Sequence, residues 1–302
     1  SDLELDADEL PLFMLSSLLP ERTTWSGSLG LEGAGVTPDS MSLDLVGSAY
    51  MSRYGDLRID TLSMGLRIRN GVLIADSLRT NVGGVDVVGR GRLGLVEGRF
   101  GSASLDFSAD RLVGLRPALM GVADSIIVQE DLTPLDREFL RLQGIEPDTF
   151  PRLADVQLDG SLVGAASISG HVGDIDLGVI MRLENASWKA SGIDSARVAF
   201  TATGLPDTQG RVQVGASAHG IEVGGRRFQQ GGFEADMLAQ DGEGRLDIVR
   251  RPGEQYHAIG SFVIDADGGS VDMDSLEVRV DEQRWALAKP AHVEWEIGRA
   301  HV

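Results

Sequence analysis

Cysteine is absent from the 302 residues, which excludes structural disulfides and any zinc or iron–sulfur site that depends on thiolates. Long hydrophobic runs are also missing: no stretch reaches 18 apolar residues, the length that a transmembrane helix needs. Positive charge is scarce, because 27 Lys and Arg face 46 Asp and Glu and leave a net charge of −19. A phosphate backbone requires a basic face, so this balance argues against a nucleic-acid partner.

Catalytic motifs are equally scarce. The sequence contains no H-E-x-x-H, no G-x-S-x-G and no P-loop. Gly89–Gly94 fits G-x-G-x-x-G, but no helical pattern follows it, so it does not predict a nucleotide loop. Four aspartates between Asp265 and Asp274 lack the spacing of an EF-hand, and we interpret them as the wet face of a hairpin. We therefore predict no enzyme activity, no cofactor and no bound metal.

The pattern that dominates the chain has a period of two residues. In Asp174–Glu184 the aliphatic side chains alternate with charged or small ones, which predicts a strand with one wet face. Leu57–Arg69 alternates in the same way, but its phase changes, and one extra residue near Thr61 would produce that change as a β-bulge.

Turn-forming residues separate the alternating segments. Glycine is abundant, at 39 of 302 residues, about twice its usual share of roughly 7%. The breaks that carry hairpin-turn chemistry are Arg69–Gly71, Asn81–Gly84, Gly224–Gly225, Gln230–Gly232, Asp241–Gly242 and Asp267–Gly269. Their spacing predicts a long antiparallel meander of about 20 strands.

Helical patterns are few. Leu10–Leu19 is short and apolar, and Val113–Val122 predicts a helical turn. Asp131–Gln143 is the strongest helical pattern, because Thr133 can cap it and Pro134 suits its first turn. We predict a helical insertion or lid over residues 120–152.

A weak internal repeat suggests two related halves. Leu3–Leu10 resembles Leu105–Leu112, and Gly27–Leu29 resembles Gly160–Leu162. We therefore divide the chain into a first β unit (1–119), the insertion (120–152) and a second β unit (153–295). The last segment, 296–302, reads EIGRAHV, which is one reading frame of a common sequencing adapter, so we expect it to be an artefact.

Periodicity alone leaves the architecture open. A closed sandwich or a solenoid would show the same alternation, with the apolar residues packed against another layer. The 5% aromatic content, the abundant glycine and the lack of a Greek-key break favour one open sheet. We predict an all-β fold with minor helix, in which a meander curls into an elongated U-shaped, taco-like groove with short helical insertions.

Several phrases resemble the AsmA-like/TamB group of envelope proteins. One phrase is Leu5–Leu12 followed by Trp25–Gly33, and another is Ser187–Lys189 followed by Ala196–Phe200 and Gly204–Pro206. Arg284–Ala291 is similar to the recurring W-x-L-x-x-P-A phrase of TamB. The match is best to the repetitive middle of such proteins. The family's N-terminal membrane anchor and C-terminal domain have no counterpart here, so we expect a fragment.

The resemblance implies a periplasmic β-groove that is anchored in the inner membrane through a segment outside this chain. It implies phospholipid transport between inner and outer membrane and support of outer-membrane biogenesis, including protein assembly and secretion. The implied partners are phospholipid acyl chains and an outer-membrane β-barrel of the assembly-module type, which would be reached through regions outside this chain.

On this reading the apolar positions of the alternating segments line a lipid groove. They are Leu62, Met64, Leu66, Ile68, Leu105, Phe107, Ile175, Leu177, Val179, Met181, Leu183, Val198, Phe200, Val212, Val214, Phe233, Met237, Phe262, Ile264, Leu276, Val278 and Val280. The alternative that we keep open is a secreted structural or adhesive β-solenoid of the autotransporter-passenger kind. Such a solenoid requires parallel coils and a filled core.

Overall fold

The computed structural model is a single large β-sheet with almost no helix. It describes residues 2–11, 23–54, 57–115, 137, 141, 158–189, 191–206, 209–264 and 268–296. The strands of the first half are β1 (Asp2–Pro11), β2 (Thr24–Ala34), β3 (Ser42–Tyr54), β4 (Leu57–Arg69), β5 (Val72–Val82), β6 (Val85–Gly94) and β7 (Gly101–Ala109).

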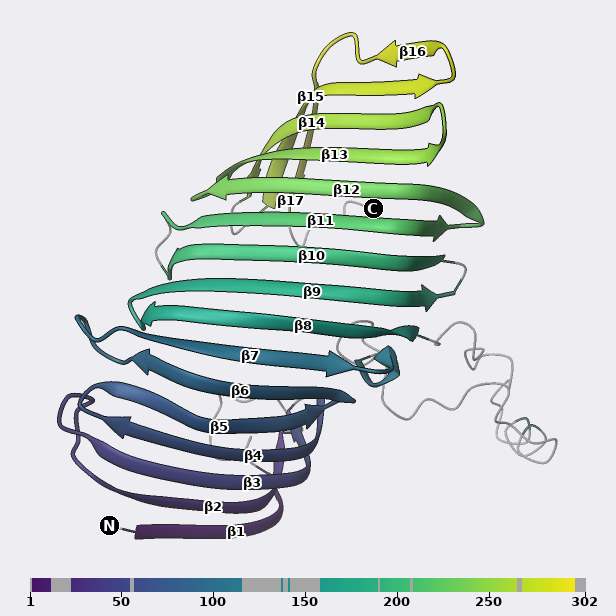
Figure 1. Cartoon of the computed structure of the whole chain (residues 1–302). Helices are drawn as coiled ribbons and strands as arrows, with labels where there is room; N and C mark the ends of the chain where they lie inside the picture. The colour runs from purple at the N-terminus through teal and green to yellow at the C-terminus, as the bar shows by residue number, and fades with distance from the viewer. Residues whose placement is uncertain are drawn as a thin grey trace.

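The second half continues the same sheet. Its strands are β8 (Leu158–His171), β9 (Asp174–Trp188), β10 (Ser191–Leu205), β11 (Arg211–Val223), β12 (Arg226–Leu238), β13 (Asp241–Arg251), β14 (Glu254–Ile264), β15 (Gly268–Val280), β16 (Gln283–Ala286) and β17 (Ala291–Glu296). In chain order they lie one beside the next, as Figure 1 shows from purple β1 to yellow β15.

Each strand from β1 to β15 is antiparallel to the next, so the sheet is a meander. β16 and β17 both pair with β15, opposite Glu277–Val280 and Gly268–Met273 respectively. The seventeen strands therefore occupy sixteen positions, and the sheet is not closed. It curls along its length into a groove, most strongly at β2–β6 (Figure 1). The predicted fold class is confirmed.

Local chemistry explains most of the hairpins. Asn70 and Gly71 have φ of +49° and +75°, and the pairs Gly83–Gly84 and Gly224–Gly225 are also left-handed. Two consecutive positive φ angles define the tight turn whose twist matches a β-hairpin, so these predicted turns are confirmed. The predicted bulge is confirmed as well, because the β4–β5 register shifts between Ile59 and Thr61.

Two predicted turns are wrong. Gln230–Gly232 lies inside β12, and Asp241–Gly242 begins β13 after a turn at Ala239–Gln240. The glycines there serve packing: a side chain at Gly231 would meet Ile221, and one at Gly242 would overlap the ring of Phe262. Another predicted turn, Asp267–Gly269, lies partly outside the described residues, and its two glycines begin β15.

The predicted helical segments are only partly described by the structure, and one of them is contradicted at its start. Leu10 and Pro11 belong to β1, which contradicts the start of the helix predicted at Leu10–Leu19, and its remaining residues lie outside the described chain. A short 3-10 helix, η2 (Leu112–Leu115), occupies the start of the turn predicted at Val113. Within 120–152, Arg137 and Arg141 are helical and the rest is not described. Among the described residues no helix has the length and apolar character needed to cross a membrane.

The two predicted β units are halves of one sheet, since β7 pairs directly with β8 from Gly101–Gly170 to Ala109–Leu162. The repeat between them has a structural counterpart. Gly27 and Gly160 both have positive φ, +154° and +123°, and both lie where the ladder to the next hairpin partner shifts register. A side chain at either position would overlap the neighbouring strand, and in each case the extra residue of the bulge lies in the partner strand, β3 or β9.

Candidate ligand-binding face

One face of the sheet, which we call the apolar face, carries uninterrupted rows of apolar residues. Residues directly opposite in a ladder point to the same side, so the registers can be followed from strand to strand. One such row runs Leu29, Gly47, Met64, Leu78, Gly89, Leu105, Ala166, Val179, Phe200, Val214, Ala235, Gly244, Gly260, Met273 and Ala291. It crosses every strand from β2 to β15 and ends in β17 without one polar side chain.

The neighbouring row is also apolar, except for Thr80. It runs Ala49, Leu62, Thr80, Val87, Phe107, Gly164, Met181, Val198, Ala216, Phe233, Leu246, Ala258 and Leu276. By alternation along the strands, all 22 residues predicted from sequence to line a groove point to the apolar face.

Glycines on this face receive the side chains of their neighbours. A Cβ at Gly164 would overlap the ring of Phe107, and one at Gly47 would meet Met64 Cε at 2.8 Å. On the opposite face, a Cβ at Gly215 would find nothing within 4 Å. The apolar side chains therefore pack across the glycines and make a continuous lining. Part of the high glycine content is explained by the room that these side chains need.

The lining is not covered by a second layer within the described residues. Of the 22 predicted lining residues, twenty are half-buried, while Phe233 and Ile264 are 40% and 46% exposed. The buried apolar residues of the described chain are Ala49, Val85, Ala109, Leu112 and Ala202, three of which are alanine. A sheet packed in a sandwich would bury its large aliphatic residues instead. No part of the described chain thus covers the apolar face.

A hollow of about 350 Å³ marks this face at its C-terminal end. Phe233, Leu246, Phe262, Val271 and Met273 are among its lining residues, which come from β12 to β15. It has the apolar character of a site for hydrocarbon.

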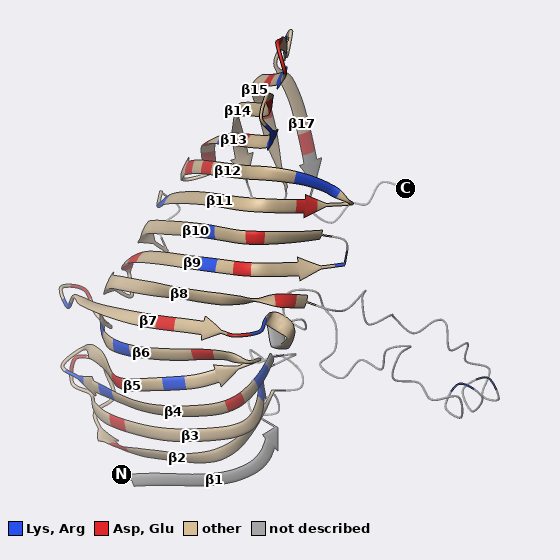
Figure 2. Cartoon of the chain, turned by 45° about the vertical axis from the view of Figure 1, so that its right-hand side comes forward, with Lys and Arg blue, Asp and Glu red and all other residues tan. Residues whose placement is uncertain are grey.

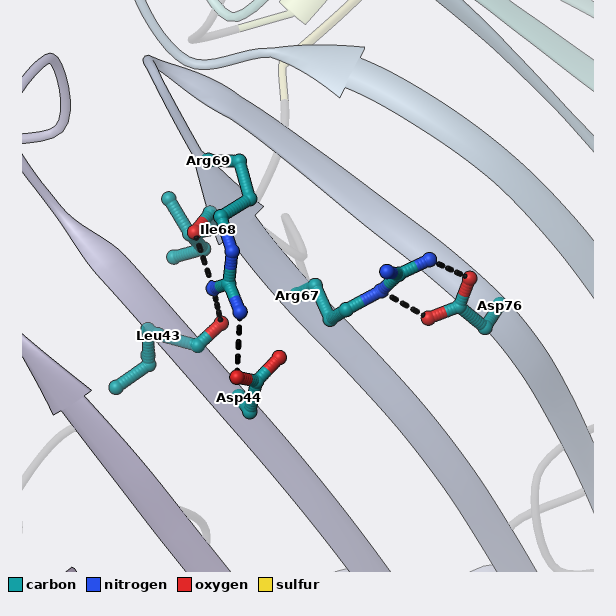
Figure 3. A network of polar contacts seen from close by, with 6 residues as sticks. All are labelled: Leu43, Asp44, Arg67, Ile68, Arg69 and Asp76. Carbon is teal, nitrogen blue, oxygen red and sulfur yellow. Dashed lines mark hydrogen bonds and ion pairs between the residues drawn. The ribbon is translucent and has the colours of Figure 1, made fainter.

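The opposite face, which we call the polar face, carries ion pairs together with exposed apolar side chains such as Val46, Val163 and Ile180. On β3–β5, Arg67 donates two hydrogen bonds to Asp76, and Arg69 contacts Asp44 at 2.5 Å and the carbonyl oxygens of Leu43 and Ile68 (Figure 3). The hydrogen bond from Arg67 holds the pKa of Asp76 below its usual value. These residues keep the face opposite the apolar face in contact with water.

A hollow of about 700 Å³ on the polar face is lined by the charged residues Asp106, Arg182 and Arg197 and also by apolar residues that include Val163 and Ile180. Of the four aspartates between Asp265 and Asp274, Asp265 and Asp267 lie outside the described residues, and Oδ1 of Asp272 accepts a hydrogen bond from Nδ1 of His292 at 2.7 Å. No group of three metal-ligating side chains forms within the described chain.

One carboxylate interrupts the apolar face, at the rim where β13 turns into β14. Glu254 is 4% exposed, and its Oε1 accepts hydrogen bonds from Tyr256 at 2.7 Å and from Nη1 of Arg250 at 2.9 Å. Its Oε2 accepts one from Nε of Arg251 at 2.9 Å. The hydrogen bonds from Tyr256, Arg250 and Arg251 lower the pKa of Glu254 to about 2.

This depressed pKa makes a prediction about acid stability. A carboxylate whose pKa falls on folding stabilises the protein above its unfolded value, near 4.5, and the contribution disappears as the pH falls toward 2. Wild type should therefore have a higher urea midpoint than Glu254→Gln at pH 6, and the gap between the two midpoints should shrink steadily as the pH falls from 4.5 to 2. As a control, Glu243→Gln, on the same strand pair, should track wild type throughout; a gap for E254Q that was as large at pH 2.5 as at pH 6 would contradict the assignment.

Sequence reasoning missed this cluster. The signal was present, since Arg250 to Glu254 read R-R-P-G-E around a turn, but alternation treats charged residues at a strand end as solvated. The bulge that brings both arginines to one carboxylate is invisible without the register.

Comparison of the chain with protein-family models, with curated proteins and with solved structures finds no match.

Proposed function

We propose that this chain shields phospholipid acyl chains on its apolar face, as the groove segment of a TamB/AsmA-like envelope protein. The observation that supports the proposal best is the pair of apolar rows that cross the sheet while their side chains remain half-exposed. An open, continuous, apolar surface of this kind has no use in a protein that only packs against itself.

The energetics favour such a role. Exposing one methylene to water costs about 0.8 kcal/mol, so a tail of about 16 methylenes costs about 13 kcal/mol. A lining without charges or hydrogen-bonding groups removes this cost and holds no single position more tightly than the next. Lipid could therefore move along the row from β2 to β17 without meeting a large barrier.

The proposal places the protein in the periplasm, anchored in the inner membrane through a segment outside this chain. It would support outer-membrane biogenesis, and an outer-membrane β-barrel of the assembly-module type would be its partner through regions outside this chain. The support is the resemblance of Arg284–Ala291 and the related phrases to that family, together with an antiparallel groove of the expected kind.

The β-solenoid alternative finds little support. It requires parallel ladders, whereas the described strands pair antiparallel, apart from a single parallel bridge between Gly94 and His171. Its filled core would also bury the large aliphatic residues that are half-exposed here.

Photo-crosslinking on one strand tests the proposal. We expect p-benzoylphenylalanine in place of Leu177, on the apolar face of β9, to crosslink to phospholipid during expression in a bacterial envelope. The same group in place of Ile180, which is 52% exposed on the opposite face, should not. Mass spectrometry of the adducts identifies the lipid. Equal crosslinking at the two positions, or none at Leu177, would sink the proposal.

A further inference from the structure

The rim around Glu254 is built by a β-bulge. Val249 lies opposite Gln255, and Arg251 lies opposite Glu254, so β13 has one residue more than β14 at this point. In a bulge two residues oppose one, and here the two are Arg250 and Arg251. Both side chains therefore turn to the side of Glu254, as their hydrogen bonds show. Without the extra residue, alternation would send one of them to the polar face.

Glu254 orients the two arginines but accepts hydrogen bonds from only some of their N–H groups. Its hydrogen bonds engage Nη1 of Arg250 and Nε of Arg251. A guanidinium has five N–H donors, so Nη2 of Arg250 and both terminal nitrogens of Arg251 remain available to an outside acceptor. The carboxylate is buried and the arginine side chains are 42% and 60% exposed, so the free donors face outward.

Arg226 adds a third guanidinium at the same end of the sheet. It is the first residue of β12, at the end of the strand that is blue in Figure 2. Its positive charge opposes the rise in the pKa of the Tyr256 phenol. The next residue, Arg227, is paired with Asp194 at 3.0 Å, whereas Arg226 has no ion-pair partner among the described residues.

The cluster is positive in a protein that is strongly negative. Three guanidinium groups lie at this end of the sheet: those of Arg250 and Arg251 are hydrogen-bonded to Glu254, and that of Arg226 acts on the neighbouring Tyr256. Asp281 also lies at this turn, where its N–H donates to the carbonyl of Gly253 at 2.7 Å. These three arginines and the two acids Glu254 and Asp281 together carry one positive charge, in a chain whose net charge is −19.

The cluster lies beside the apolar hollow. Along β14, Ala258 lines the hollow and Glu254 precedes it by four residues, or roughly 13 Å at the usual strand rise. Between them on the apolar face lie Tyr256 and its partner Ile248. A basic rim, a short apolar bridge and a hydrocarbon-sized hollow thus follow one another in a line.

We propose that Arg226, Arg250 and Arg251 form a station for the phosphate head of a diacyl lipid whose chains lie in the hollow between β12 and β15. This inference rests on the proposed acyl-shielding function and adds that this rim distinguishes heads by charge. Guanidinium groups suit the task because their paired N–H donors match phosphate oxygens. Glu254 is a positioning residue: it holds two arginines in place before the ligand arrives.

The test compares two lipids with the same chains. Dioleoylphosphatidic acid, whose head is a phosphate monoester, should bind the purified chain about tenfold more tightly than dioleoylglycerol, whose head is neutral, as measured by displacement of a fluorescent fatty-acyl probe. The triple variant R250Q/R251Q/E254Q, which removes the charges without leaving a buried carboxylate unpaired, should abolish this preference. It should leave dioleoylglycerol binding unchanged.

Controls separate the possible failures. R226Q should weaken only phosphatidic acid, by a few fold, and it breaks no ion pair within the described chain. R79Q/R90Q, which removes two exposed arginines of the polar face, should change neither lipid. Equal binding of both lipids by wild type would overturn the rim station and leave the proposed function standing, whereas binding of neither lipid would overturn the proposed function itself. Binding of inorganic phosphate that phosphatidic acid cannot displace would also overturn the station.

Discussion

Val179→Asp is expected to reduce phospholipid binding by more than tenfold while the sheet stays folded. Val179 lies in the middle of the row that crosses the sheet, so its replacement puts a carboxylate where an acyl chain would lie. Desolvating that charge against hydrocarbon costs several kcal/mol. Because Val179 is only half-buried, the carboxylate stays hydrated in the ligand-free protein, and far-UV circular dichroism should be unchanged.

The adjacent residue offers a matched control. Ile180→Asp introduces the same charge one residue along β9, on the polar face, and should bind lipid like wild type. Met181→Asp, back on the apolar face, should behave like V179D. If V179D instead unfolds the protein, as a charge in a closed core would, the apolar face is packed rather than open and the groove reading fails.

Gly94→Ala is expected to cost roughly 3 kcal/mol of stability, the upper range for overpacking. Gly94 ends β6 where three loops meet: its carbonyl accepts from Val172 N–H at 2.9 Å, and Leu95 N–H donates to Gly71 at 2.8 Å. A Cβ there would overlap the backbone carbonyl of Arg99 and meet His171 Cβ at 2.9 Å. Neither backbone can move without breaking this junction.

Gly215→Ala is the corresponding control within a strand. A methyl group at Gly215 would meet no atom within 4 Å, and the residue needs no left-handed backbone. Alanine there should be neutral or stabilise by up to about 1 kcal/mol, because it loses less backbone entropy on folding. Urea denaturation of both variants measures the difference. Equal stability of G94A and G215A would contradict the described junction at the end of β6.

Much of the fold was predictable because one face of each strand meets water. Alternation in Asp174–Glu184 and Leu57–Arg69 predicted β9 and β4, and the change of phase predicted the bulge at Thr61. Asn70–Gly71 predicted its turn because few other residues adopt its left-handed angles. Against the predicted number of about 20 strands, the described residues form seventeen, of which β9 and β10 reach 15 residues each.

The errors have a common cause. Gln230–Gly232 looked like a turn, but its glycines make room for side chains from neighbouring strands, and sequence alone does not show which residue lies opposite. The same lack of register hid the bulge at Arg250 and with it the cluster at the rim. Cross-strand neighbours are distant in sequence, so their fit leaves no local pattern.

By itself the sequence determined which residues alternate and where most hairpins turn, because the period of a strand and the left-handed geometry of a turn are properties of a few adjacent residues. Only the tertiary structure decided that the apolar sides of all strands align into one face and that no described layer covers it. It also decided that two arginines share a single carboxylate at the rim. These outcomes depend on ladder register and sheet curvature, which are set by contacts between strands rather than within them.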